Sequence, residues 1–245
     1  MRHAGLPLLA AAALLAACAA PRPAPPAPGA APLPREAYRA LGASGARLYR
    51  LDGRASLVLV LVDPAGRLAR LGHRHVVAGG RPEGLLAVWP GGGGEADLYL
   101  AVPHLRVDAH RDRLAAGGPY AAPVPAEDAR ATRSNMLKPG QLDAGAHPWI
   151  HVRAEFPRRG APVRLRLSLR GVTRSYVLPV AWASGRDGRL TVSGRFTLRQ
   201  TDFGIRPYQA LGGALRVADR VRVRFRLVAR PLAPAGSGRP PPPAR

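Results

Sequence analysis

Apolar and polar residues alternate one by one along several segments of this chain. Residues 163–170 (VRLRLSLR) are the plainest case, because every second residue is Val or Leu and the residues between are Arg or Ser. Successive side chains of a β-strand point to opposite faces, so the pattern predicts a strand with one apolar and one polar face. Residues 176–182, 190–199 and 220–227 repeat it. The apolar side of these four strands comprises Leu165, Leu167, Leu169, Leu178, Val180, Trp182, Val192, Phe196, Leu198, Val223, Phe225 and Leu227.

Shorter apolar segments predict further strands, and few segments predict helix. Turn-rich residues at 171–173 (GVT) and 185–188 (GRDG) would join the later strands as hairpins. Residues 125–138 predict one short helix in a connection. So many amphipathic strands indicate an all-β fold, and we expect a single antiparallel β-barrel that is apolar inside and wet outside. The further strands are expected at 47–52, 56–63, 67–77, 84–89, 97–107 and 148–156.

The formal net charge of +22 would by itself suit a nucleic-acid-binding protein. The strand pattern explains it differently, since rows of Arg alternate with apolar residues and would lie in solvent on the barrel exterior. Lys138 is the only lysine among the 37 Lys and Arg residues, a bias typical of a GC-rich genome. We therefore expect no nucleic-acid partner, although a basic surface could favour anionic phospholipid or lipopolysaccharide.

The N-terminus has the composition of an export signal. Arg2 and His3 precede residues 6–17, a mostly apolar segment shorter than the roughly 20 residues of a membrane-spanning helix. Residues 15–18 (LAAC) resemble the lipobox of bacterial lipoproteins, which implies removal of residues 1–17 and lipidation of Cys18. Cys18 is the only cysteine, so it forms no intramolecular disulfide. The alternative is an ordinary signal peptide cleaved nearby, with Cys18 incidental.

A lipidated N-terminus would make this a lipoprotein of the cell envelope. Two or more acyl chains anchor a protein stably to a membrane, so we expect a periplasmic domain tethered by Cys18. Ala19 follows Cys18 in place of an Asp, which favours the outer membrane over the inner one. We assign residues 18–46 to the lipidated cysteine and a Pro/Ala-rich linker, 47–231 to the barrel domain and 232–245 to a disordered Pro-rich tail.

Several motifs follow one another along the expected barrel. They are residues 49–52 (YRLD) with Ser56, 71–75 (LGHRH), 147–152 (HPWIHV), 169–174 (LRGVTR) and 193–205 (SGRFTLRQTDFGI). In their order and spacing they resemble the motifs of the YceI-like domain family, the first three those of its N-terminal and central parts and the last two those of its C-terminal half. The resemblance implies a lipocalin-like barrel with an apolar tunnel, and a polyisoprenoid-type lipid as the ligand inside it. The apolar residues named above would then form the wall that contacts this lipid.

His73 and His75 are the most distinctive polar residues. Two positions apart in a strand, they would share a face at the barrel interior or mouth, where they and Asp202 are candidates to contact the polar end of a ligand. Paired imidazoles could instead bind Zn or Cu, but a metal site needs three or four ligands, and no spacing shows that further histidines converge. The remaining histidines are His3, His104, His110, His147 and His151.

No sequence motif indicates catalysis. The chain has no Gly-x-Ser-x-Gly segment, and lipidation would occupy its only thiol. We therefore expect a binding protein without a cofactor. Two alternatives stay open: a site for a metal or small polar ligand at His73 and His75, and an envelope interaction module with a solid core. The sequence does not determine the oligomeric state.

Overall fold

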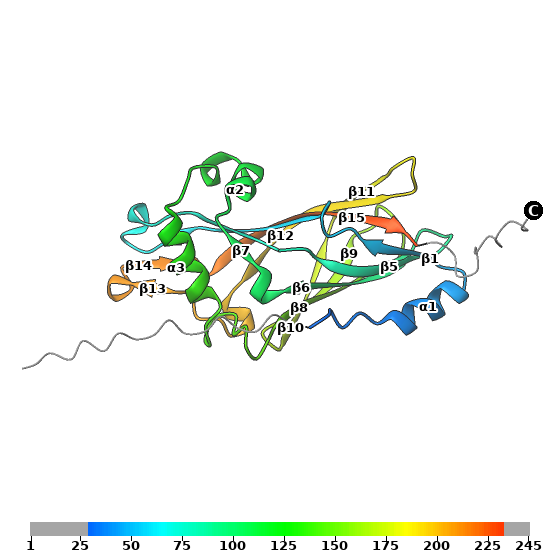
Figure 1. The fold of residues 1–245 in the computed structure, drawn as a ribbon, viewed down its shortest axis with the longest axis horizontal. Coiled ribbons are helices and arrows are strands. Elements are labelled where there is room, and N and C mark those ends of the chain that lie inside the picture. Colours follow the sequence, from blue (N-terminus) through cyan, green and yellow to red (C-terminus); the bar gives the residue numbers. More distant parts are fainter. Residues whose placement is uncertain (1–28, 233–245) are drawn as a thin grey trace, which may run out of the picture.

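The structure, a computed structural model, describes residues 29–232 (Figure 1). The predicted signal peptide, Cys18 and residues 233–245 of the predicted tail lie outside them. In the described part the helices are α1 (Arg35–Ala43), α2 (His110–Ala116) and α3 (Ala126–Met136), with 3-10 turns η1 (Ala69–Leu71), η2 (Val102–His104), η3 (Gly118–Tyr120), η4 (Thr201–Phe203) and η5 (Leu211–Gly213). The strands are β1 (Arg47–Leu51), β2 (Leu57–Val62), β3 (Pro64–Ala65), β4 (His75–Ala78), β5 (Glu83–Val88), β6 (Gly94–Ala101), β7 (Arg106–Val107), β8 (Trp149–Phe156), β9 (Val163–Leu169), β10 (Val172–Leu178), β11 (Val180–Ser184), β12 (Leu190–Arg199), β13 (Gln209–Ala210), β14 (Leu215–Val217) and β15 (Arg220–Pro231).

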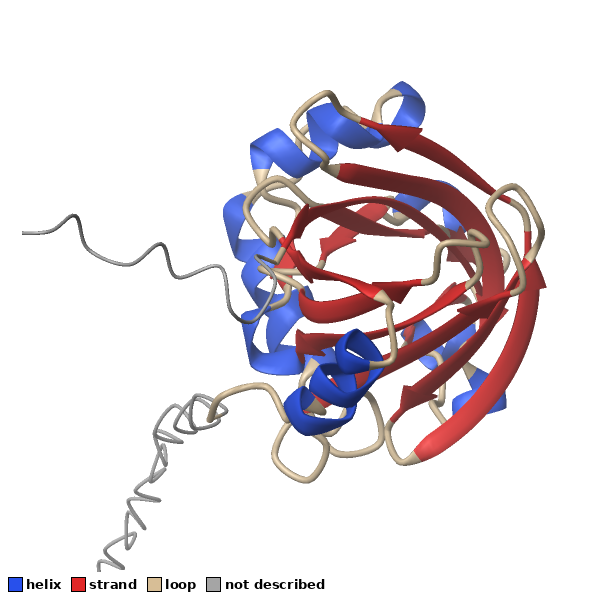
Figure 2. Cartoon of the chain, turned by 90° about the vertical axis from the view of Figure 1, so that its right-hand side faces the viewer, coloured by secondary structure: helices blue, strands red, loops and turns tan. Residues whose placement is uncertain are grey.

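One large antiparallel sheet makes up most of the fold. Its hydrogen-bonded order is β10-β9-β8-β6-β5-β1-β15-β2-β4-β7, and β12 joins the other edge of β15 and also pairs with β11. The strands curve round a common axis with helices outside them (Figure 2). The predicted all-β, antiparallel architecture is thus confirmed. A small second sheet of β13, β14 and β3 extends one end of the molecule.

The large sheet stays open along one seam, unlike the closed wall that the sequence predicts. β10 pairs with β9, whereas β11, which follows after Pro179, pairs with β12. No backbone pairing joins β10 to β12 in the described part of the chain. Proline has no N–H and cannot donate to a ladder, and Pro179 is where the chain changes from one neighbour to the other. Side chains bridge the seam, since the ring centroids of Tyr176 and Phe196 are 5.2 Å apart.

The hairpin between β9 and β10 turns one residue earlier than the sequence predicts. Leu169 pairs with Val172, so Arg170 and Gly171 alone form the turn. Both have positive φ, 52° and 73°. Two central residues of positive φ make the turn whose twist matches that of the flanking strands. Gly171 adopts this conformation at little cost, and it sets the register of the pair.

Four expected elements differ in the structure. The predicted strand 176–182 is divided at Pro179 into β10 and β11. The predicted strand 67–77 begins only at His75, because residues 64–72 form β3 and η1. The predicted strand 97–107 is divided at η2, which contains Pro103. Helix α1 lies within residues 18–46, which the sequence assigns to the linker, so the folded part begins upstream of Arg47. None of the helices in residues 29–232 is long and apolar enough to cross a membrane.

The alternating segments orient as predicted. In β15 Val221 and Val223 are buried while Arg220 and Arg222 are exposed. In β9 the four apolar residues are buried, and Arg164 and Arg166 are exposed. A shift of one residue would place these guanidinium groups in the interior, so burial fixes the register of each strand.

Helix α1 is held on the outer face of the sheet by a buried carboxylate. The Tyr38 hydroxyl donates to Asp97 of β6 (3.1 Å), and His151 Nε2 (2.7 Å) and Arg153 (3.2 Å) of β8 donate to the same carboxylate. Burial alone would raise the pKa of Asp97, but the hydrogen bond from His151 and the charge of Arg153 outweigh it and hold the pKa below its ordinary value. Burial and the Asp97 charge raise the pKa of Tyr38, so its hydroxyl remains a donor.

We expect Tyr38→Phe to lower the free energy of unfolding by about 1–3 kcal/mol, because a buried carboxylate loses one of its three hydrogen-bond donors. Urea unfolding followed by circular dichroism measures the difference. Tyr208→Phe is the control, since Tyr208 is exposed and its hydroxyl has no hydrogen bond to the described residues. Equal losses in both variants would contradict this account of α1.

Candidate functional site

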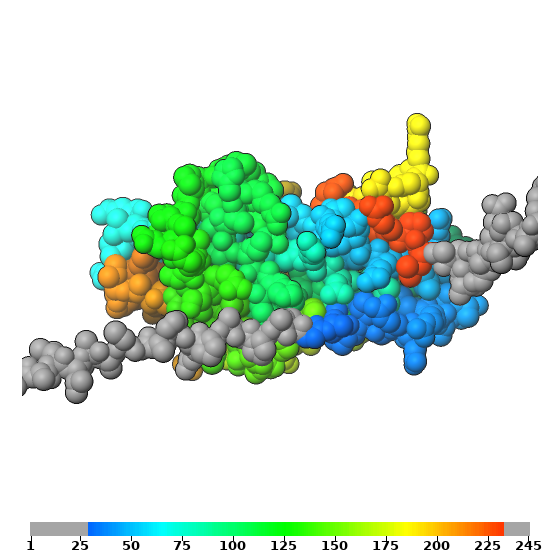
Figure 3. Space-filling view, viewed as in Figure 1, coloured from blue at the N-terminus to red at the C-terminus, as the bar shows by residue number. Residues whose placement is uncertain are grey.

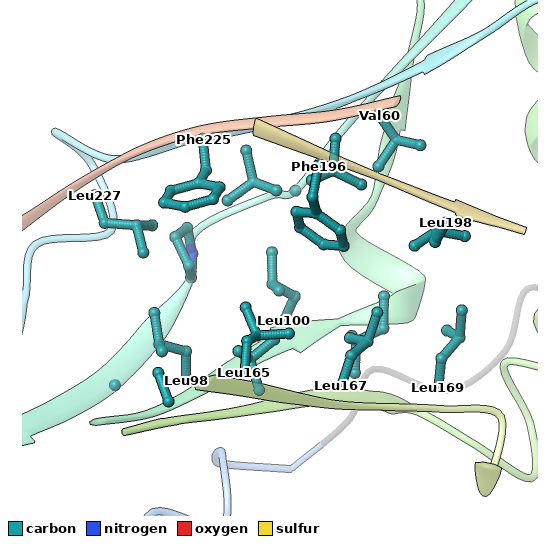
Figure 4. A pocket seen from close by; sticks show the side chains of 18 of the residues that line it. Val60, Leu98, Leu100, Leu165, Leu167, Leu169, Phe196, Leu198, Phe225 and Leu227 are labelled. Atoms are coloured by element: carbon teal, nitrogen blue, oxygen red, sulfur yellow. The ribbon is translucent and has the colours of Figure 1, made fainter. Parts of the chain in front are cut away.

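An elongated apolar cavity lies inside the curved sheet. Its volume is about 280 Å³. Leu165, Leu167 and Leu169 of β9 project into it from one side, and Phe196, Leu198 and Phe225 project toward them from β12 and β15 (Figure 4). The four inward residues of β9, from Val163 to Leu169, all line the cavity, so it runs along about 20 Å of this strand.

All twelve residues that the sequence places on the apolar wall line this cavity. They cover only part of it. The rest of the wall comes from neighbouring strands, among them β2, β6 and β8, whose inward residues alternate in the same way, as Leu98 and Leu100 do in β6 and Ile150 and Val152 do in β8. The sequence predicts these strands, and their alternation could have identified the second wall.

Apart from the indole N–H of Trp182, the polar side chains of the lining lie at one end. Among the described lining residues, Gln141 and Gln200 carry the only side-chain amides, and the lining includes no titratable residue. Gln141 donates to the carbonyl oxygen of Arg206 (2.6 Å), and Gln200 donates to that of Ala218 (2.8 Å). The N–H groups of both amides donate in these bonds, and the amide oxygens can act as acceptors toward a ligand. Both amides belong to the end of the cavity that Ile205 lines, next to η4. We call this the polar end of the cavity.

Two buried polar atoms lie on β10 and β11, the strands on either side of Pro179. The Tyr176 hydroxyl and the Trp182 indole N–H are buried and have no hydrogen-bond partner among the described residues. Burial, with the nearby Asp202 charge, raises the pKa of Tyr176, so it too remains a donor. Trp182 packs on Phe156 at a ring-centroid distance of 4.8 Å, at the end of the cavity opposite Gln200. Asp202 itself is exposed on η4, near the polar end but outside the lining.

His73 and His75 lie outside the lining of the cavity. His75 is on the face of β4 that carries Val77, but its Nδ1 bonds to Asp108 (2.6 Å). His73 is exposed and pairs with Asp128 of α3 (3.2 Å). The two imidazoles are 6.2 Å apart and meet edge to face. In residues 29–232 no three His, Cys, Asp or Glu side chains gather in a way that could hold a metal ion.

Asp108 anchors α2 and its flanking turns. Its carboxylate is fully buried and accepts from the backbone N–H of Val76 (2.8 Å), from His75 and from Arg113 of α2. Burial alone would raise the pKa of Asp108, but the hydrogen bonds from His75 and Val76 and the ion pair with Arg113 hold it below the ordinary value. His75 therefore has a structural partner in this fold.

Comparison with known proteins finds a family-model match over part of the chain and solved structures that share its fold. Residues 119–229 match the family model described as the YceI-like domain, which confirms the predicted resemblance. No curated protein matches the chain. The crystal structure of BcnA from Burkholderia cenocepacia aligns with a TM-score of 0.53 and 16% identity over 73% of this chain and 98% of that one. A polyisoprenoid binding domain from Saccharophagus degradans, implicated in plant cell wall breakdown, aligns with a TM-score of 0.53 and 13% identity over 75% and 98%. At such identities the likeness shows the fold alone.

Asp108→Asn is expected to lower the free energy of unfolding at pH 7 by about 3–5 kcal/mol, because it leaves the buried Arg113 without its counter-charge. The pKa of Asp108 is lower in the folded than in the unfolded chain. Its stabilisation is therefore complete above the unfolded value of about 3.9 and disappears as pH falls through the folded value. The difference between wild type and variant should thus stay constant from pH 7 to about pH 4 and shrink as the pH falls further.

Urea unfolding at a series of pH values gives this difference directly. Asp187→Asn, which breaks an exposed ion pair with Arg189, is the matched control and should change stability little at any pH. A difference between wild type and Asp108→Asn that stays constant down to pH 3 would show that the Asp108 charge is not what stabilises α2.

Proposed function

Because the chain carries a YceI-like domain, we propose that its cavity binds the long apolar chain of a lipid of the polyisoprenoid type. The observation that carries the proposal is the continuous aliphatic lining of an elongated cavity. Ligand cavities are typically about 300–1,000 Å³. A volume of about 280 Å³ is just below that range and suits one slender chain better than a bulky ring system.

The composition of the chain supports a hollow interior. A small barrel leaves room that side chains either fill or reserve for one ligand. Aromatic residues make up only 5% of this chain, and most of the lining is Val, Leu and Ala. An unfilled apolar cavity costs stability in proportion to its volume, at about 24 cal/mol per Å³ in measured cases. Filling this cavity with a hydrocarbon chain would therefore stabilise the fold by an amount on the order of several kcal/mol.

The polar end of the cavity gives the bound lipid a direction. An apolar chain is free to lie among the Leu and Val side chains, whereas a hydroxyl, phosphate or carbonyl head would lose its hydrogen bonds there. Gln141 and Gln200 are the lining residues that can replace those bonds. Asp202 lies two residues beyond Gln200 and is proposed, as in the sequence prediction, to contact the polar head from outside the lining.

Binding is favoured over catalysis by the chemistry of the lining. The described lining residues provide no carboxylate, imidazole, thiol or hydroxyl that could serve as an acid, base or nucleophile. The polyisoprenoid binding domain from Saccharophagus degradans, whose fold this chain shares, supports the same choice.

Mass spectrometry of lipids extracted from the natively purified protein tests the proposal, and we expect a prenyl lipid in near-stoichiometric amount. Ala154→Phe adds a ring on the cavity side of β8 and should reduce the retained lipid at least tenfold. Ala181→Phe adds the same ring on the exposed face of β11 and should retain as much lipid as wild type. Circular dichroism shows whether both variants are folded.

Two outcomes would contradict the lipid proposal. One is a wild-type protein that contains no lipid and takes up no added prenyl alcohol. The other is equal lipid content in the folded Ala154→Phe and Ala181→Phe variants, which would place the lipid outside the cavity.

We also propose that Cys18 is lipidated and tethers the domain to the cell envelope, with the outer membrane favoured. Support comes from residues 15–18, which lie outside the described residues, and from the absence of any other cysteine. In cells fed a clickable fatty acid, wild type should be labelled and sediment with membranes. Cys18→Ser should lose the label. Equal labelling of both would disprove this anchor.

A further inference from the structure

Three of the six exposed large apolar side chains in the described residues gather at one end of the molecule. Leu71 is 61% exposed, Leu211 is 66% exposed and Tyr208 is 47% exposed. All three belong to residues 64–72 and 206–217, which we call the end lobe. Residues 64–72 and 206–217 lie next to one another at the end of the molecule opposite the turn between β11 and β12 (Figures 1 and 3).

The end lobe is a built structure and not a pair of loose loops. Its frame is the small sheet of β13, β14 and β3, in which Arg216 pairs with Ala65 and also with Gln209. Leu68 N–H donates to the Ala214 carbonyl (2.9 Å) and Val217 N–H donates to that of Tyr208 (2.9 Å). Both η1, with Leu71, and η5, with Leu211, contact β14. The fold therefore holds these two leucines in exposed turns that both contact one short strand.

The charge of the end lobe has a single sign. Residues 64–72 and 206–217 contain Arg67, Arg70, Arg206 and Arg216 and no Asp or Glu. All four guanidinium groups are exposed, and none makes an ion pair with another described residue. Exposed leucines and a tyrosine surrounded by arginines match the composition of a bilayer interface, where apolar side chains enter the acyl boundary and basic ones bind anionic headgroups.

We propose that the end lobe docks on an anionic phospholipid surface, with Leu71, Leu211 and Tyr208 inserted at the headgroup level. The lobe also borders the polar end of the cavity, because Ile205 lines the cavity immediately before Arg206 and Gln141 donates to the Arg206 carbonyl. Docking would thus bring that end of the cavity to the membrane surface. The membrane contact is argued from the lobe alone, and it would stand even if the cavity held another cargo.

A single fluorophore can report on this contact. Cys18→Ser removes the only cysteine, so Leu211→Cys in the full chain can be labelled with a dye that brightens and shifts to the blue in apolar surroundings. Val177→Cys, at a residue of β10 that is 70% exposed and outside the lobe, carries the control dye. The dye reports only its own surroundings. Membrane attachment through other parts of the chain would therefore change the signal of the dye at position 211 and of the dye at position 177 alike.

The probe is a vesicle of phosphatidylcholine containing about one third phosphatidylglycerol. We expect a blue shift and a severalfold brightening at position 211, and neither at position 177 or on pure phosphatidylcholine. Replacing Arg67, Arg70 and Arg216 with Gln should weaken the apparent vesicle affinity about tenfold or more. The charge-matched control replaces Arg158, Arg159 and Arg186, near the opposite end, and should change it less than twofold.

Several results would overturn the proposal. They are no response at position 211, the same response at position 177, an equal response on pure phosphatidylcholine, and equal effects of the two triple variants. A response at position 211 that appears without vesicles as protein concentration rises would assign the lobe to a second copy of the chain. Lipid retention by the unlabelled protein is measured separately, so failure of the cargo proposal and failure of the membrane contact are distinguishable.

Discussion

The cavity depends on one constraint, the division of strands such as β9, β12 and β15 into an apolar face and a face rich in arginine. Moving one strand by a single residue would exchange Val221 and Val223 for Arg220 and Arg222 inside the sheet, and several guanidinium groups would lose their water together. That penalty is much larger than the difference between alternative backbone pairings. The cost of burying the outward guanidinium groups therefore determines which side chains face the cavity. These charged groups act in this way without contacting the interior.

The same division explains why the interior stays hollow. Val, Leu and Ala satisfy the apolar face but reach only a short way from the backbone, and few large rings are available to fill the centre. The open seam follows from a different cause, since Pro179 ends the pairing of β10 and the chain joins β12 only from Val180 onward. Near the seam the wall is closed by side chains such as Tyr176 and Phe196, which can change rotamer more readily than a hydrogen-bonded ladder can separate.

Much of this could be predicted from the sequence because alternation has a direct physical meaning. It identified β9, β12 and β15 with their inward residues, and all twelve expected wall residues line the cavity. It could not show that Pro179 would leave the sheet unclosed, because pairing partners are not encoded in a local pattern. The same alternation led us to expect His73 and His75 at the barrel interior or mouth, whereas both lie outside the cavity lining. Strand parity put His75 on the correct face, but its partner Asp108 is 33 positions away and only the fold brings them together. Helix α1 was missed because its decisive contact, Tyr38 with Asp97, is also long-range.

The two ends of the molecule differ in a way that the function we propose requires. At one end Trp182 and Phe156 pack together against aliphatic neighbours, so a bound chain would meet mainly apolar groups there, with the Trp182 indole N–H as the one polar side-chain group. At the other end the lining gains the amides of Gln141 and Gln200, and the backbone continues directly into the end lobe with its exposed leucines and arginines. A lipid has the same polarity, with a hydrocarbon tail and a headgroup that prefers water or a bilayer surface. If the tail lies toward Trp182 and the head toward Gln200, the headgroup faces the surface on which we propose that the lobe docks. An anionic bilayer would then hold the protein in the one orientation in which cargo can pass between cavity and membrane without its head crossing the apolar interior.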